Sequence, residues 1–167
     1  MCIRDRDKVL FELWATALII NRVFLIPAQL NFYYYDFFSH HPKVLWTDSS
    51  WLLLDKVIGY PYDLPIPNII GYEYFNRPET SANTGWLGSG YAHAGALGVF
   101  LYAIILGLLF KFLDYKSKAL NKNFITTSFA PFVVYLFSSD LKTMFLTHGL
   151  IIYILVLMLI KEQKKHG

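Results

Sequence analysis

Cysteine is almost absent from this chain: among its 167 residues only Cys2 carries a thiol. A single cysteine excludes an internal disulfide and a metal site built from several thiolates. Charged residues make up 16% of the sequence, whereas soluble domains carry about 25%. The sequence also lacks a Walker loop, a dinucleotide-binding fingerprint and a nucleophile elbow. Nothing therefore indicates a soluble nucleotide-binding enzyme or a hydrolase of the common serine type.

The N-terminal residues 1–6 read MCIRDR and resemble translated sequencing-adapter read-through. We therefore exclude them from the fold reasoning and take the natural sequence to start near Asp7. With Cys2 set aside, no thiolate nucleophile or cysteine metal ligand is left. A polytopic membrane protein is usually longer than this chain, so we expect an incomplete fragment that lacks upstream helices of the same chain.

What the sequence has in abundance is apolar and aromatic side chains, at 55% and 18% of its residues. The mean hydropathy of +0.38 places the chain in the membrane class. The formal net charge is +3, but the lysines are concentrated in two short segments. That distribution indicates membrane topology and not nucleic-acid binding. We therefore expect a lipid bilayer as a partner and no nucleic acid.

Three apolar stretches predict membrane-spanning helices over 94–113, 123–140 and 142–160. About 20 apolar residues cross the hydrocarbon core of a bilayer, and each stretch approaches that length. Pro131 and the hydroxyl residues of the second stretch are tolerated in lipid when neighbouring groups satisfy the backbone. The predicted fold is all-α: a polytopic helical membrane protein with about three spans and a long external loop of short helices.

Lysine placement predicts the orientation of these spans. The loop between the first two spans and the C-terminal tail are both lysine-rich, which by the positive-inside rule places them in the cytoplasm. The hairpin between the last two spans and everything before the first span then face outward. We accordingly expect a periplasmic or interfacial loop region over 7–93, a transmembrane region over 94–160 and a cytoplasmic tail over 161–167.

Within the external region we expect short helices around 30–38 and 49–58, followed by an irregular YPYDLPIPN stretch at 60–68. The segment 7–27 is ambiguous. Its apolar run is only about 12 residues long and is interrupted by charge, which favours an external helix lying against the membrane. A spanning helix is the alternative.

Two arginines of the external region, Arg22 and Arg77, are candidate ligands for a lipid phosphate or diphosphate. The planar guanidinium fork suits phosphate oxygens. For Arg77 a salt bridge to Glu73 or Glu79 is the other interpretation. Because phosphate recognition needs convergent donors, we expect the two arginines to face a common polar pocket.

His93 lies where the external region enters the first span, shortly before Gly95 and Gly98. Its imidazole can act as a general base or as a donor to a phosphate, and Glu79 is a second candidate base. A histidine held by an interfacial hydrogen bond is the alternative. Asn83 and Tyr91 can converge on the same helix entrance.

His148 lies inside an apolar run, which makes it a candidate substrate-binding residue, although a structural hydrogen bond explains it equally well. Four loop carboxylates are interpreted as solvated: Asp36, Asp48, Asp55 and Asp63. The pair His40 and His41 has no spacing partner that completes a zinc site. We expect no metal and no cofactor.

Four segments together resemble the C-terminal third of bacterial oligosaccharide repeat-unit polymerases, the O-antigen polymerase family. They are RVFLIPAQLNFYYYDFFSHHP, YPYDLPIPNIIG, NTGWLGSGYAHAGALGVFLYAIILGLL and SSDLKTMFLTHGLIIYILVLML. The recurring feature is a glycine-rich helix entrance, matched here by Asn83, Gly85, Leu87, Gly88, Tyr91, Gly95 and Gly98. Thr84 adds one residue between Asn83 and Gly85 relative to the family pattern.

The resemblance implies a membrane glycosyltransferase of the bacterial inner membrane. Its substrate would be an oligosaccharide linked to undecaprenyl diphosphate, polymerised at the periplasmic face for surface polysaccharide synthesis. Arg22 and Arg77 match the loop arginines that hold the lipid diphosphate in this family. The alternatives are a transporter or flippase for the lipid-linked glycan, an O-antigen ligase, and a non-catalytic membrane subunit.

Overall fold

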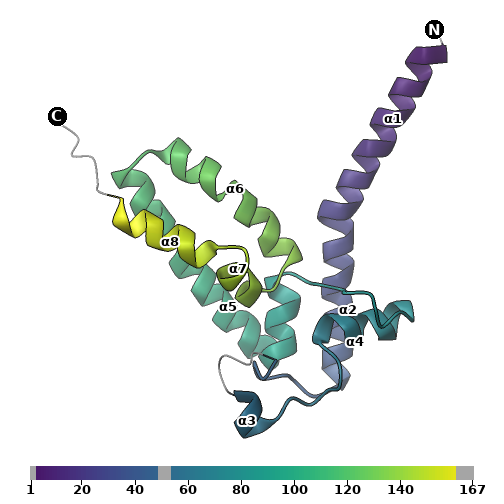
Figure 1. Cartoon of the computed structure of the whole chain (residues 1–167), viewed down its shortest axis with the longest axis vertical. Coiled ribbons are helices and arrows are strands. Elements are labelled where there is room, and N and C mark those ends of the chain that lie inside the picture. Colours follow the sequence, from purple (N-terminus) through teal and green to yellow (C-terminus); the bar gives the residue numbers. More distant parts are fainter. Residues whose placement is uncertain (1–2, 49–53, 161–167) are drawn as a thin grey trace.

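The computed structural model describes residues 3–48 and 54–160, and these two ranges form helices and connecting turns without any strand (Figure 1). The all-α prediction is thus confirmed for this part of the chain. The helices in chain order are α1 (Ile3–Ile20), the π-helix η1 (Asn21–Leu25), α2 (Ile26–His40), α3 (Leu54–Ile58), α4 (Ile66–Phe75), α5 (Trp86–Ala119), α6 (Lys122–Ser138), α7 (Leu141–Leu146) and α8 (Leu150–Leu159).

Helices α1, η1 and α2 form one long rod that stands beside the group of α5, α6, α7 and α8 (Figure 1). The part Glu12–His40 is long and apolar enough to cross a membrane. The segment 7–27 therefore belongs to a helix of spanning length, and this length favours the spanning alternative over an external helix lying against the membrane. Pro27 lacks the N–H that would bond to the carbonyl of Val23, and the wider π turn accommodates this break within the rod.

Helix α5 is also long and apolar enough to span a membrane, but it contains a sharp kink. Ala94 has φ −145° and ψ 28°. Gly95 has φ 62° and ψ −141°, a backbone conformation that residues with a Cβ atom rarely adopt. The kink separates a short segment over 86–93 from a long segment over 96–119. At about 1.5 Å per residue the long segment measures ~36 Å, enough for a hydrocarbon core of about 30 Å.

Two glycines allow the segments on either side of this kink to touch. A Cβ built on Gly98 would lie 2.0 Å from the carbonyl oxygen of Gly90, so the backbones meet with no room for a side chain. Both glycines are buried. The glycine-rich entrance that the sequence shows thus folds into a bent helix and not into a straight one.

The last predicted span differs from the structure. Instead of one helix over 142–160, the short helices α7 and α8 are separated by a break at Gly149, whose φ is +80°. Helix α8 has 10 residues and is ~15 Å long, about half of a hydrocarbon core. The prediction of one continuous helix over 142–160 is therefore wrong, and the third span itself stays a prediction. Helix α6 agrees in position with the second predicted span and has 17 residues.

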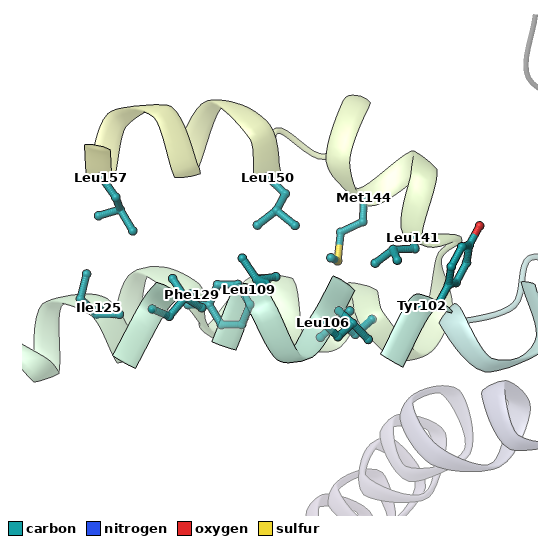
Figure 2. Close-up of a cluster of buried hydrophobic side chains, with 11 residues drawn as sticks. Tyr102, Leu106, Leu109, Ile125, Phe129, Leu141, Met144, Leu150 and Leu157 are labelled. Atoms are coloured by element: carbon teal, nitrogen blue, oxygen red, sulfur yellow. The ribbon is translucent and has the colours of Figure 1, made fainter. Parts of the chain in front are cut away.

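Leucines and aromatic residues hold α5 to α8 together. Figure 2 shows Met144 of α7, with Leu150 and Leu157 of α8, pointing toward Leu109 of α5 and Phe129 of α6. These side chains are buried. A second buried cluster joins α2, α4 and the first segment of α5 through Leu30, Tyr34, Phe37, Phe38, Val44, Ile66, Ile70, Ala82 and Ala92.

The predicted short helices of the external region are found in part. The helix expected around 30–38 is the end of α2 and not an isolated element. The one expected over 49–58 appears as α3 in its described residues, since 49–53 lie outside the described ranges. The stretch 60–68 is irregular only as far as Pro65. Helix α4 begins at Ile66 with Pro67 in its first turn, where a missing N–H costs nothing.

Candidate functional site

A polar pocket of about 100 Å³ lies where the first segment of α5 meets the chain after α2 and the start of α7. Its hydrogen-bonding side chains come from segments far apart in the sequence: Tyr34, Asp48, Asn83, Thr84, Ser89, His93, Asp140, Lys142 and Thr143. We call this space the polar pocket. It brings together one imidazole, two carboxylates and one ammonium group.

The kink in α5 explains why His93 is held at this place. The helix stops there, so the carbonyl groups of Ala92 and His93 lose their helical partners. They accept hydrogen bonds from the backbone N–H groups of Val44 and Leu45, both at 3.0 Å. The segment after α2 thus caps the broken helix and is brought against the polar pocket.

Leu45 and Trp46 have φ values of 50° and 58°, in the left-handed region that residues other than glycine seldom occupy. Strain of this kind persists only where surrounding contacts impose it, and it is frequent at functional sites. Here it places the Trp46 indole against the His93 ring, with centroids 5.3 Å apart and an interplanar angle of 18°. The indole N–H donates to the hydroxyl of Tyr102 at 3.1 Å.

His93 is 1% exposed, and its Nδ1 atom has no hydrogen-bond partner. The nearest charged group is Asp48, whose Oδ1 lies 3.9 Å from Nδ1, beyond hydrogen-bond distance. Buried nitrogen atoms are nearly always paired, so an unpaired one inside a pocket needs an explanation. A ligand hydroxyl or a water in the pocket would supply the missing partner.

Lys142 lies between the two carboxylates of the pocket. Its Nζ is 2.5 Å from Oδ2 of Asp48 and 3.7 Å from Oδ2 of Asp140. The hydroxyl of Ser89 donates to the other oxygen of Asp140. Two carboxylates share one ammonium, so the group carries a net negative charge while His93 is neutral. The carboxylates of such a pocket accept hydrogen bonds from hydroxyl groups, and the net negative charge disfavours the binding of an anionic group.

Asp48 corrects one interpretation made from the sequence. It was expected to be a solvated loop carboxylate, yet it is 18% exposed and paired across the pocket with Lys142. Its position depends on the hydrogen bonds of the preceding residues to α5, which no local sequence pattern encodes. The same holds for Asp140 and Lys142, which come close to Asp48 and His93 only because α7 folds back onto α5.

Of the predicted substrate-binding residues, Asn83 borders the polar pocket together with His93. Its amide donates to the hydroxyl of Ser81 at 3.1 Å. Tyr91 does not border this pocket. It packs on Tyr35, with ring centroids 4.7 Å apart. The Lys43 ammonium lies over the Tyr91 ring, 4.4 Å from its centre. Asn83 and Tyr91 therefore do not converge as expected.

Arg22, Arg77 and Glu79 are exposed, and none of them borders the polar pocket. Arg22 lies on η1, whereas Arg77 and Glu79 lie after the end of α4. In the described part of the chain, neither arginine is in an ion pair, so the alternative salt bridge from Arg77 to Glu73 or Glu79 is not formed. The common pocket expected for the two arginines is not the polar pocket.

His148 occupies the break between α7 and α8. Its Nε2 is 3.0 Å from the hydroxyl of Ser139, and its ring stacks on Tyr135 with centroids 4.2 Å apart and an interplanar angle of 7°. It does not border the polar pocket. These contacts favour the structural hydrogen bond over the substrate-binding role for this histidine.

Sequence reasoning missed the residues that surround His93, namely Asp48, Ser89, Asp140 and Lys142. Their one shared signal is position, because each lies near an end of an apolar segment. Comparison of the chain with protein-family models, with curated proteins and with solved structures gave no match. Across the described ranges, no three His, Asp or Glu side chains cluster in a way that would hold a metal ion. The groups present supply acid–base chemistry and hydrogen bonding.

Proposed function

We propose that the protein polymerises lipid-linked oligosaccharides in the bacterial inner membrane, with His93 as general base. The reaction would transfer a glycan from undecaprenyl diphosphate to a hydroxyl of a second lipid-linked repeat unit. One observation carries the proposal: a buried histidine with an unpartnered ring nitrogen borders a polar pocket at the head of an apolar helix of spanning length. The likeness of four segments to O-antigen polymerases supports it.

The chemistry requires few groups. An acceptor hydroxyl gives its proton to His93 while its oxygen forms a bond to the anomeric carbon of the donor sugar. The bond from that carbon to the diphosphate oxygen breaks, and the electron pair leaves with the diphosphate. Burial lowers the pKa of His93 from its ordinary value, which keeps the imidazole neutral and able to accept the proton. Asp48, 3.9 Å from Nδ1, then stabilises the imidazolium that forms.

The position of the pocket along α5 fits a reaction at the periplasmic face. Lys116 and Lys118 lie at the far end of this helix. At about 1.5 Å per residue they are ~35 Å from His93, or about one hydrocarbon thickness. If the lysine-rich end faces the cytoplasm, as the positive-inside rule predicts, the polar pocket opens at the outer surface.

The proposal is tested with His93→Ala and His93→Gln in cells whose surface polysaccharide depends on this protein. Both variants should lose polymer and keep single repeat units on lipid, since loss of a positioned base costs about 10²–10⁴-fold in rate. His148→Ala is the matched control, because this histidine lies outside the polar pocket. Normal polymer from the His93 variants at unchanged protein level would remove the catalytic role.

A second candidate function, transport of the lipid-linked glycan, is favoured by the two interrupted helices. Transporter sites are often built where helices break, and both the α5 kink and the α7–α8 break provide such points. The two functions differ in where substrate accumulates. A failed polymerase leaves repeat units exposed on the periplasmic side of intact spheroplasts, whereas a failed transporter leaves them on the cytoplasmic side. Digestion with an added glycosidase separates the two outcomes.

A further inference from the structure

A second hollow lies on the other side of the first segment of α5 from the polar pocket. Ser89 and His93 border the polar pocket. Leu87 and Tyr91 instead line a groove of about 520 Å³ between this segment and α2. Helical residues are rotated by about 100° per position, so side chains two positions apart point to nearly opposite sides. We call this second hollow the aromatic groove, and the two hollows share no described lining residue.

The walls of the aromatic groove are mostly large apolar and aromatic side chains, among them Phe32, Tyr35, Leu87, Tyr91 and Val99. None of the described residues that line it is charged. Phe32 is 73% exposed and Tyr35 is 58% exposed, so the groove is open at the surface. Val99 lies in the long segment of α5, which has spanning length, whereas Tyr91 lies before the kink. The groove therefore extends from the apolar segment of α5 toward the polar entrance of this helix.

The ammonium group of Lys43 lies beside the Tyr91 wall of the groove. Its Nζ is 4.4 Å from the ring centre of Tyr91, and it donates a hydrogen bond to the carbonyl oxygen of Phe38. Lys43 is held there because the N–H of the next residue, Val44, bonds to the carbonyl of Ala92 at the kink. In the described ranges Lys43 takes part in no ion pair. Its contacts with a carbonyl and an aromatic ring leave the positive charge without a negative partner.

This ammonium group can bind a further acceptor. An ammonium has three N–H donors, of which one is used by the Phe38 carbonyl and one faces the Tyr91 ring. Burial lowers the pKa of Lys43 from its ordinary value, since its charged form loses water without gaining a carboxylate. An anionic group bound at the third donor would offset that loss. Lys142 differs in this respect, because Asp48 and Asp140 already surround it.

We propose that the aromatic groove binds an anionic phospholipid of the bilayer, with an acyl chain lying between α2 and α5 and the phosphate on Lys43. The inference goes beyond the proposed function and does not rest on it, because this lipid is not consumed and binds away from His93. Tyr35 and Tyr91 lie at the level between chain and phosphate, with ring centroids 4.7 Å apart. Amphipathic rings settle at this level of a membrane, where one side is apolar and the other is wet.

Other occupants fit less well. A free phosphate ion would bind Lys43 but leave the apolar walls of Phe32 and Leu87 exposed. A zwitterionic lipid brings its own cationic group close to Lys43, which weakens the net attraction. An apolar helix of a second copy of this chain would cover the walls and leave the Lys43 charge without a partner. An anionic phospholipid satisfies both the walls and the charge.

The experiment measures binding of phosphatidylglycerol and phosphatidylcholine with identical acyl chains to the full chain in detergent micelles, by native mass spectrometry. The first lipid is anionic and the second is zwitterionic. Lys43→Gln removes the cation, Lys43→Arg keeps it, and Ala96→Trp fills the groove from an exposed position. The matched controls are Lys56→Gln, an exposed lysine on α3, and Leu108→Trp, 62% exposed on α5 and outside the groove.

Wild type, Lys43→Arg and both controls should prefer phosphatidylglycerol by about fivefold, the effect of one lysine near an anionic lipid. Lys43→Gln should bind the two lipids equally, and Ala96→Trp should weaken both. Thermal unfolding establishes that each variant is folded, and Ala96→Trp tests the groove with Lys43 in place even where Lys43→Gln is unstable.

An unchanged preference in folded Lys43→Gln, or unchanged binding of both lipids in Ala96→Trp, would overturn the proposal. So would a wild-type protein that binds the two lipids equally. A lipid-free dimer of the wild type that Ala96→Trp dissociates would assign the groove to a second copy of the chain and refute the lipid site.

Discussion

The ammonium group of Lys142 lies 2.5 Å from the carboxylate of Asp48, although 94 positions separate the two residues in the sequence. This ion pair joins the chain that follows α2 to the start of α7, beside the first segment of α5. It closes the polar pocket beside His93. Both side chains are about four-fifths buried, so the pair is shielded from solvent far more than a surface salt bridge is.

A double-mutant cycle on this pair should show strong coupling. We expect Asp48→Asn and Lys142→Gln each to destabilise the fold, because each leaves the partner charge partly buried and less well paired. The coupling energy should reach about 0.5–3 kcal/mol, as for groups in direct contact within one network. Chemical unfolding in detergent measures it.

The exposed pair Asp114 and Lys118, one helical turn apart at 2.7 Å, serves as the control for this cycle. Exposed pairs of this spacing couple by only about 0.3–0.5 kcal/mol. Equal coupling energies for the two pairs would show that the contact between Asp48 and Lys142 contributes no more than a solvated one.

Gly98→Ala should destabilise the protein through the bend in α5. The added methyl group would lie 2.0 Å from the carbonyl oxygen of Gly90, so the two segments of the helix must separate. Overpacking of this kind costs about 1–3 kcal/mol. The midpoint of thermal unfolding in detergent should fall accordingly.

Gly107→Ala is the matched control in the same helix, because nothing lies within 4 Å of its added Cβ. Alanine has the higher helix propensity by about 1 kcal/mol, so this variant should be neutral or more stable. A Gly98→Ala variant as stable as Gly107→Ala would mean that the kinked contact of α5 does not form.

Membrane topology is tested by labelling single cysteines placed in a Cys2→Ser background. A cysteine at Lys118 should react only after a membrane-impermeant reagent gains access to the cytoplasm, as lysine placement predicts. A cysteine at Asp63, in the loop before α4, should react in intact cells. The reverse pattern would invert the chain and move the polar pocket to the cytoplasmic side.

Much of the architecture followed from the sequence alone. Composition and the apolar runs predicted an all-α membrane protein, and the runs around 94–113 and 123–140 coincide with parts of α5 and α6. Periodicity and residue type act locally, so they specify where helices form. The glycine-rich approach to α5 forms the bend in this helix, because glycine permits the φ of Gly95 and the close contact between Gly90 and Gly98.

The tertiary structure alone decided which polar residues meet. His93 was singled out from its place at a helix entrance, but its burial depends on Val44 and Leu45 bonding to the broken helix. The break at Gly149 was missed because an apolar run does not reveal where a left-handed residue ends a helix. Asp48 and Lys142 meet through folding over long sequence separation, where local propensity carries no information and packing between helices determines every contact.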